Sequence, residues 1–126
     1  MRILSEHGSA GKRAERACLS AWFVAAVGEM VQRWLPKAKV VKAYNTVGNA
    51  LMVHPKLPGG PPTMFIAGND EGTKKTVAQV CDAFGWETID IGGIEGSRHL
   101  EPMCVVWVLH GARTGKWNHA FKMLHG

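Results

Sequence analysis

Residues 63–91 constrain the fold of this 126-residue chain more than any other stretch. The apolar run 63–68 (TMFIAG) predicts a buried strand, and the alternating run 86–91 (WETIDI) predicts a second one. Between them, Asn69-Asp70 offers an N-cap, apolar residues recur at helical spacing, and Gly85 stands where a helix should stop. Strand, helix and strand within about thirty residues form a βαβ unit, whose strands should be parallel with a right-handed crossover.

A further strand is expected at 39–44, within the stretch KVVKAYNTVGNALM at 39–52. It breaks at Asn45-Thr46, a pair that favours caps and turns, and 47–53 is expected to form a short helix capped by one of these side chains. α/β sheets present ligand-binding groups where their parallel strands end. Asn45 and Thr46 are therefore candidate ligand-facing residues, and the alternative is an ordinary strand-to-helix connection.

Helices are predicted on both sides of these strands. Apolar residues recur at helical spacing over 13–35, with an interruption at Gly28, and this helix should end before Pro36. Residues 94–110 are apolar around most of a helical surface, which is typical of a helix buried in an oligomer. A last short helix is predicted over 117–124.

Two other features complete the local predictions. Residues 54–62 (HPKLPGGPP) hold four prolines and two glycines, so a stiff loop is expected there. In the helix predicted over 73–84, Lys74 and Lys75 are expected on the face opposite the apolar one.

Composition narrows the function classes. The formal charge is +5 and the pI about 9.4, but the basic residues are spread along the chain, which favours a solvated basic surface over a nucleic-acid site. Cys18, Cys81 and Cys104 are widely spaced, form no Cys-x-x-Cys pair and are expected to be buried thiols in a reducing cytoplasm. The six histidines show no metal-ligand spacing, and the apolar run 19–27 is too short to span a membrane.

A polar cluster opens the long apolar segment just after Gly92-Gly93: Glu95, Ser97, Arg98 and Glu101. A helix start with backbone donors and an arginine is a candidate anion site. The alternative is helix capping together with an intrahelical Arg98–Glu101 salt bridge. Glu101 is also a candidate partner that would allow Arg98 to be partly buried.

Three ordered stretches carry a family resemblance: KVVKAYNTVGNALM, PGGPPTMFIAGNDEGTKKTV and FGWETIDIGGIEGSRHLEPM. From about Gly28 to Leu124 the chain resembles the NADP-dependent oxidoreductases related to deazaflavin-cofactor-dependent reductases. That family has a dinucleotide-binding Rossmann domain followed by a small helical C-terminal part. The resemblance implies that Asn45 and Thr46 line the reaction cleft and that Ser97, Arg98 and Glu101 border it. Asn45, Thr46, Ser97 and Arg98 are accordingly the candidate cofactor-binding residues.

The resemblance covers the C-terminal part of that family, because residues 1–27 do not resemble its first strands. The sequence also contains no Gly-x-Gly-x-x-Gly turn. We therefore expect an α/β chain with a partial Rossmann-like, three-stranded parallel sheet, flanking helices and a helical C-terminal segment. Residues 1–27 would form an unrelated, mostly helical segment, and 28–126 the oxidoreductase-like part. NADP is the implied cofactor, but most of its affinity would come from the glycine-rich part.

Three functional hypotheses remain open at this point. The first is a truncated relative without reductase activity of its own, forming a small homo-oligomer through the 39–44 sheet edge or the C-terminal apolar helix. The second is an oxidoreductase that transfers hydride with NADP(H) bound across an oligomer or partner cleft. The third is a non-enzymatic anion- or nucleic-acid-binding module.

Overall fold

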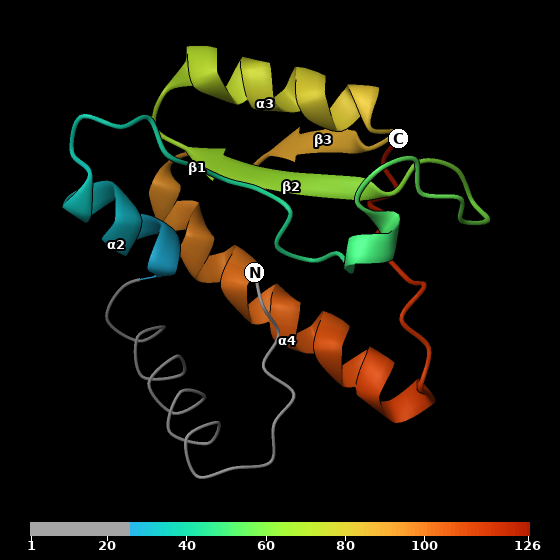
Figure 1. The fold of residues 1–126 in the computed structure, drawn as a ribbon. Helices are drawn as coiled ribbons and strands as arrows, with labels where there is room; N and C mark the ends of the chain where they lie inside the picture. Colours follow the sequence, from blue (N-terminus) through green and yellow to red (C-terminus); the bar gives the residue numbers. More distant parts are fainter. Residues whose placement is uncertain (1–25) are drawn as a thin grey trace, which may run out of the picture.

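The computed structural model describes residues 26–126. The chain forms an α/β fold with a three-stranded sheet and helices on both faces, as the sequence predicted (Figure 1). Its elements in chain order are α2 (Val27–Trp34), β1 (Val41–Lys42), the 3₁₀ turn η1 (Asn49–Leu51), β2 (Thr63–Gly68), α3 (Glu71–Ala83), β3 (Glu87–Asp90), the 3₁₀ turn η2 (Ile94–Gly96) and α4 (Ser97–Thr114). Most of the predicted 1–27 segment, the first part of the predicted 13–35 helix and Cys18 lie outside the described residues.

The βαβ unit is confirmed. Strands β2 and β3 pair in parallel, with Thr63 opposite Glu87 and Ile66 opposite Asp90. Helix α3 joins them, and the side chain of Asp70 caps its start by accepting a hydrogen bond from the Thr73 amide at 2.8 Å. Gly85 follows the helix with a φ of 87°, a left-handed conformation that glycine adopts without a steric penalty.

The sheet is mixed, so the prediction of three parallel strands is wrong for one strand. β1 lies at the edge of the order β1-β2-β3 and runs antiparallel to β2, with Val41 opposite Gly68. The physical reason is the connection between them. Parallel neighbours need a crossover, usually a helix, whereas residues 43–62 contain only the short turn η1 and the proline-rich loop.

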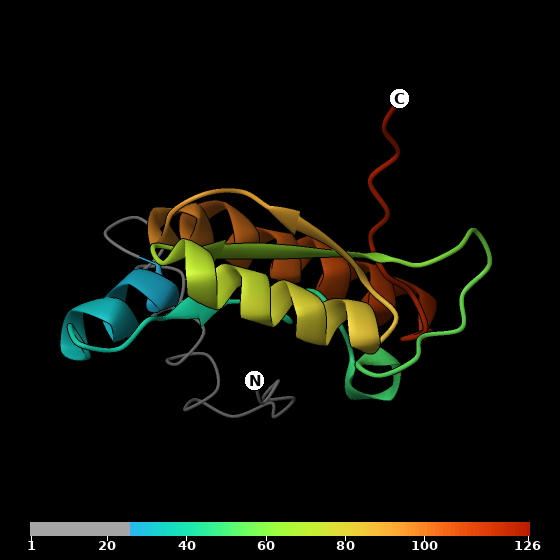
Figure 2. The same cartoon turned by 90° about the horizontal axis from the view of Figure 1, so that it is seen from above.

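The sheet lies between α3 on one face and α4 on the other (Figure 2). Helix α3 packs on β2 and β3, and its Cys81 joins a buried core with Met64, Ile66 and Trp86. Trp86 is 2% exposed and donates its indole N–H to the Met52 carbonyl at 2.9 Å. That bond ties the loop after η1 to the core.

The helical boundaries differ from the predictions over 47–53 and in α4, and agree with them at the end of α2. Residues 47–53 contain only η1, whose N-cap is Gly48, so neither Asn45 nor Thr46 caps a helix there. Helix α4 begins at Ser97 after η2 and continues to Thr114, past the predicted end at 110. Helix α2 ends at Trp34, as the restriction before Pro36 predicted.

No helix forms over 117–124. Helix α4 stops at Gly115, whose φ is 68°, and the following segment runs back along the sheet. The Thr63 amide donates to the Phe121 carbonyl at 2.9 Å, and the Met123 amide donates to the Thr63 hydroxyl at 3.0 Å. A short isolated helix is costly to nucleate, and these contacts use its backbone groups instead.

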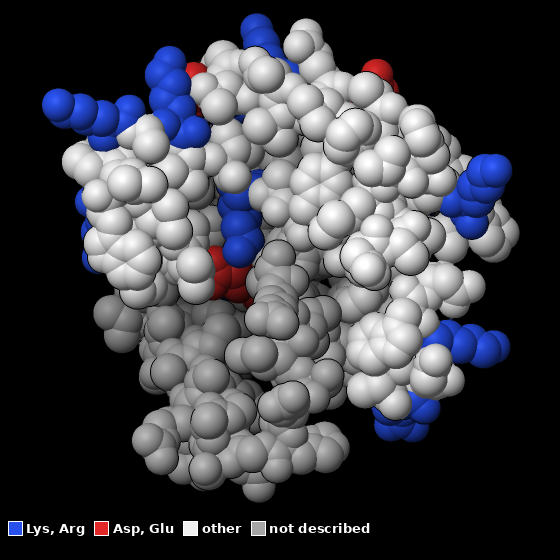
Figure 3. Space-filling model, viewed as in Figure 1, with Lys and Arg blue, Asp and Glu red and all other residues white. Residues whose placement is uncertain are grey.

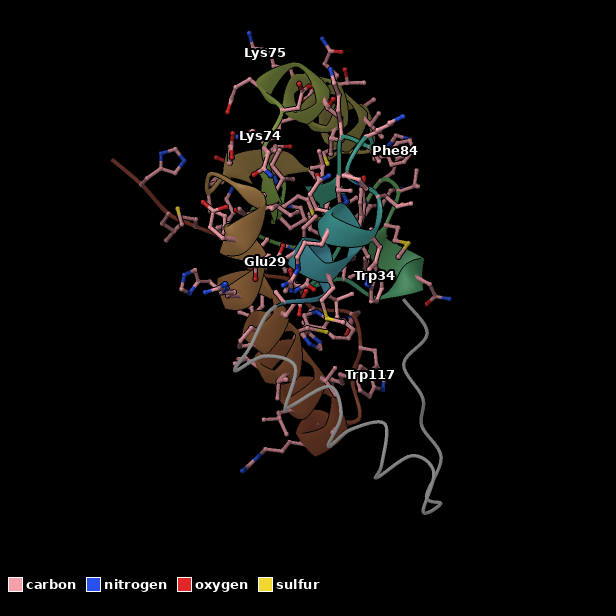
Figure 4. All side chains as sticks on the ribbon, turned by 90° about the vertical axis from the view of Figure 1, so that its left-hand side faces the viewer. Glu29, Trp34, Lys74, Lys75, Phe84 and Trp117 are labelled. Atoms are coloured by element: carbon pink, nitrogen blue, oxygen red, sulfur yellow. The ribbon has the colours of Figure 1, made fainter. Side chains whose placement is uncertain are left out.

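Lys74 also differs from its prediction, because it is 4% exposed. Its ammonium contacts the carboxylates of Glu71 and Asp90, both at 2.8 Å. These contacts, led by the hydrogen bond to Asp90, raise the pKa of Lys74 above its ordinary value. Figure 4 shows Lys75 pointing away from the molecule while Lys74 turns inward.

None of the helices within residues 26–126 is long and apolar enough to cross a membrane.

Candidate functional site

Asn45 and Thr46 are buried against α4, with 6% and 4% of their surface exposed. The Asn45 side-chain amide donates to the carbonyl of Leu100 in the first turn of α4. Tyr44, just before this pair, has a φ of 52°, a conformation that costs a non-glycine residue energy and that recurs at functional sites. The turn is therefore held tightly in an unfavourable backbone conformation.

The Asn45-Thr46 turn does not lie at the carboxyl edge of the parallel strands, where the sequence predicted it. Because β1 runs antiparallel to β2 and β3, its carboxyl end lies toward the amino ends of those strands. Asn45 and Thr46 therefore do not share an edge with Asn69 and Asp70, which follow the carboxyl end of β2. A strand parallel to β1 on its other side would be needed to place them at a carboxyl edge.

Glu101 joins three elements. Its carboxylate accepts hydrogen bonds from the amides of Val27 and Gly28 at the start of α2, at 3.1 and 3.2 Å. It also contacts the Lys42 ammonium at 3.3 Å, and the two side chains are only 6% and 17% exposed. Negative charge at a helix N-terminus is favourable, so this buried carboxylate fixes α2 and β1 to α4.

Arg98 contacts a different residue from the one predicted. Its guanidinium forms a two-point ion pair with Glu29 of α2, at 2.7 and 2.9 Å, and the Arg98 side chain is 52% exposed. Figure 4 shows Glu29 beside the first turns of α4. The expected Arg98–Glu101 pair is wrong because α2 brings a second carboxylate to the outer side of α4. The hydrogen bond from Arg98 lowers the pKa of Glu29 and raises that of Arg98.

Ser97 is fully buried where α2 crosses the start of α4. A Cβ atom at Gly28 would lie 2.3 Å from the Ser97 hydroxyl oxygen, so only glycine allows this approach. Among the described residues, the Ser97 hydroxyl and the Asn45 side-chain oxygen have no hydrogen-bond partner. Buried polar atoms without a hydrogen-bond partner are uncommon in folded proteins, so the contact between α2 and the start of α4 is an unusual feature of this fold.

The structure thus gathers the predicted site residues around the first turns of α4, but in different roles. Asn45 contacts Leu100, Ser97 faces Gly28, and Arg98 is drawn outward. Sequence reasoning missed Lys42 and Gly28. No sequence pattern indicated a role for either residue, because Lys42 is typical of a polar strand position and Gly28 of an interruption in a helix.

A shallow groove of about 580 Å³ lies at the carboxyl end of β2. It is bordered by residues of α2, the loop after it and the β2–α3 turn: Gln32, Arg33, Pro36, Ala38, Lys39, Asn69 and Asp70. Lys39 contacts Asp70 at 3.1 Å. Hydrogen bonds from the Thr73 side chain and amide, and then Lys39, lower the pKa of Asp70 to about 2.

Most groups near this groove that could hold a dinucleotide phosphate are already used within the chain, and Arg33 is an exposed cation at its border for which no ion pair is found among the described residues. A phosphate needs free backbone donors at a helix start or an unpaired cation. The start of α2 is occupied by Glu101, that of α3 by Asp70, and Arg98 by Glu29. On the face seen in Figure 3, Lys and Arg side chains are dispersed and form no continuous patch. No group of three or more His, Cys, Asp or Glu residues within 26–126 could hold a metal ion.

Two solved structures are similar to this chain. The structure of a protein from Arthrobacter sp. FB24, proposed to be an F420-dependent NADP reductase, matches with a TM-score of 0.73 and 38% identity over 78% of this chain. A hypothetical protein from Sinorhizobium meliloti matches with 30% identity and a TM-score of 0.49, over 56% of this chain and 35% of its own. The sequence matches no family model and no curated protein. The chain covers 46% of the Arthrobacter protein. The chain is therefore similar, as a partial relative, to a protein proposed to be an F420-dependent NADP reductase, and it spans less than half of that protein's length.

Proposed function

We propose that this chain is an oxidoreductase-related module that borders the reaction cleft of an NADP(H)-dependent enzyme and has no reductase activity of its own. The observation that carries the proposal is the occupancy of the candidate site. The Lys42 and Arg98 side chains and the start of α2 are already matched by carboxylates of this chain, Glu101 and Glu29. A module of this kind can position reacting groups but leaves the dinucleotide phosphates to another unit.

NADPH titration tests this proposal. The chain is expected to leave NADPH fluorescence unchanged up to about 1 mM cofactor, the weak end of specific binding. Tight binding would contradict the proposal, and its loss in Asn45→Ala would favour hydride-transfer activity instead. Asn49→Ala is the matched control, because Asn49 is exposed on η1 and does not border the site.

The second candidate is hydride transfer, with a deazaflavin as the partner of NADP(H), in a cleft completed by another subunit. It is supported by the Tyr44–Asn45 turn, where a strained residue precedes an amide oxygen with no partner among the described residues. A strand added parallel to β1 on its free side would bring this turn to a carboxyl edge, where α/β enzymes bind ligands. Under this candidate, NADPH binding would appear only with the completed assembly.

Within residues 26–126 no strand pairs with the outer side of β1. A strand edge of this kind favours association, and both candidates use it. We expect the chain to sediment as a homo-oligomer at micromolar concentration. The measurement is sedimentation velocity over a concentration series, with NADPH absorbance followed in the same cell. A monomer at every concentration would contradict the homo-oligomer, and cofactor that sediments with an oligomer would favour the second candidate.

A further inference from the structure

A pocket of about 280 Å³ lies between α4 and the segment that runs back from it, away from the Asn45–Leu100 contact. Its lining is mainly aromatic and comes from both segments: Val106, Trp107, His110, His119, Ala120 and Phe121. This volume is close to the lower end of small-molecule sites, which suits a ligand of one or two fused rings.

The aromatic walls are fixed by hydrogen bonds. The Trp107 indole N–H donates to the His119 carbonyl, and the His119 ring contacts the Trp107 carbonyl, both at 2.9 Å. The two rings stack with centroids 4.6 Å apart, and the His110 ring meets His119 edge-on at the same distance. A flat ligand would therefore meet preformed ring faces and would not need to order them.

Charge decides which flat ligand fits. Aromatic walls alone would also suit a cation. However, residues 102–126 contain three Lys or Arg residues and no Asp or Glu. The acidic side chain that contacts this segment, Glu87, is already paired with Lys122 and His125. A cation would find no carboxylate among the residues that line the pocket, whereas an anion would meet no negative charge there.

The histidines supply the polar contacts. The His119 Nε2 atom contacts the Trp107 carbonyl, so this nitrogen is the donor in that contact. Nδ1 is buried and has no partner among the described residues. His110, on the exposed side of α4, has a ring that can donate a hydrogen bond to a carboxylate at the mouth of the pocket.

We propose that the pocket between α4 and residues 119–121 binds a planar aromatic carboxylate, with its ring on the His119 and Phe121 walls and its carboxylate at His110. This site is independent of the proposed NADP(H)-related function.

The test titrates the full chain with 1-naphthoate and with 1-naphthylmethanol, its neutral analogue, at pH 7. Binding is followed by the NMR signals of the Trp107 and Trp117 indole N–H groups, since Trp117 lies 5.5 Å from Trp107. Naphthoate is expected to shift both signals and to bind about tenfold more tightly than the alcohol, the typical gain from one charge-assisted hydrogen bond. Equal affinities, or unchanged indole signals, would overturn the proposal.

Two variants separate the ring site from the carboxylate contact. Ala120→Leu fills the pocket and should abolish binding of both probes. His110→Phe keeps an aromatic wall but removes the donor, so it should weaken naphthoate about tenfold and leave the alcohol unchanged. Ala83→Leu adds the same volume at an exposed position on α3, off the pocket, and should change neither affinity. Naphthoate binding that survives Ala120→Leu in a folded chain would place the probe elsewhere and contradict the site.

Discussion

At the residue scale, the contact between Gly28 and Ser97 sets how closely α2 can approach α4. The Ser97 hydroxyl is buried without a partner among the described residues, and the space beside it accepts no side chain at position 28. A protein interior is packed too densely to absorb an added methyl group without displacement. This junction therefore depends on two small residues whose roles are steric.

Gly28→Ala is expected to lower the free energy of unfolding by about 1–3 kcal/mol, because its Cβ would overlap the Ser97 hydroxyl. Adding Ser97→Ala should recover part of this loss, since it removes the atom at 2.3 Å but keeps the Ser97 Cβ at 3.0 Å. Urea denaturation of both single variants and the double variant measures the coupling. Simple additivity of the two changes would contradict the steric explanation.

At the element scale, Glu101 holds α2, β1 and α4 together through one carboxylate. A buried charge that loses its partner is left uncompensated. In this chain the charge that would be left is the Lys42 ammonium, and two amides of α2 would also lose their acceptor. The arrangement of three elements thus rests on a residue that the sequence places in a simple helix start.

Glu101→Ala is expected to destabilise the fold by about 3 kcal/mol, the usual cost of breaking a buried ion pair. Glu101→Gln keeps an acceptor for the α2 amides and should cost clearly less. Thermal unfolding followed by circular dichroism compares the two variants. Equal losses would mean that the side-chain oxygen retained in Glu101→Gln contributes nothing and would contradict a contribution from the hydrogen bonds to the α2 amides.

The capping of α3 by Asp70 makes the free energy of unfolding depend on pH. Hydrogen bonds from Thr73 and Lys39 lower the pKa of Asp70 to about 2 in the folded chain, compared with about 3.9 in an unfolded one. The unfolded chain therefore binds the proton first as the pH falls. The stabilisation from Asp70 is complete above about pH 4 and is lost as the pH falls toward about 2.

Asp70→Asn should accordingly make stability less dependent on pH between about 4 and 2. Urea denaturation at a series of pH values measures the effect. Asp82→Asn, at an exposed position near the other end of α3, is the control and should follow the unmodified chain. A pH dependence that is the same in both variants would contradict a special contribution from Asp70.

At the scale of the whole molecule, no strand lies on the outer side of β1 within residues 26–126, and the Lys42 and Arg98 side chains at the candidate site pair with carboxylates of this chain. These charged groups hold the fold, and a strand edge of this kind can pair with another chain. Association along β1 is therefore the property on which both functional candidates depend.

The sequence predicted local structure well where short-range signals agree. Residues 63–85 show this: the apolar run, the Asp70 cap and the Gly85 stop each specify one part of the same strand and helix. The helix predicted over 117–124 shows the opposite case. Its apolar spacing is real, but backbone hydrogen bonds to Thr63, nearly sixty residues earlier, decided its conformation.

By itself, the sequence determined the fold class, the βαβ unit, the stop of α2 before Pro36 and the family resemblance, because these follow from neighbouring residues and ordered motifs. Only the tertiary structure decided the antiparallel direction of β1, the burial of Lys74 and the partners of Arg98 and Glu101. Those outcomes depend on which distant carboxylate or strand lies nearest in space. Charge pairing and strand direction are long-range choices, and periodicity along the chain carries no information about them.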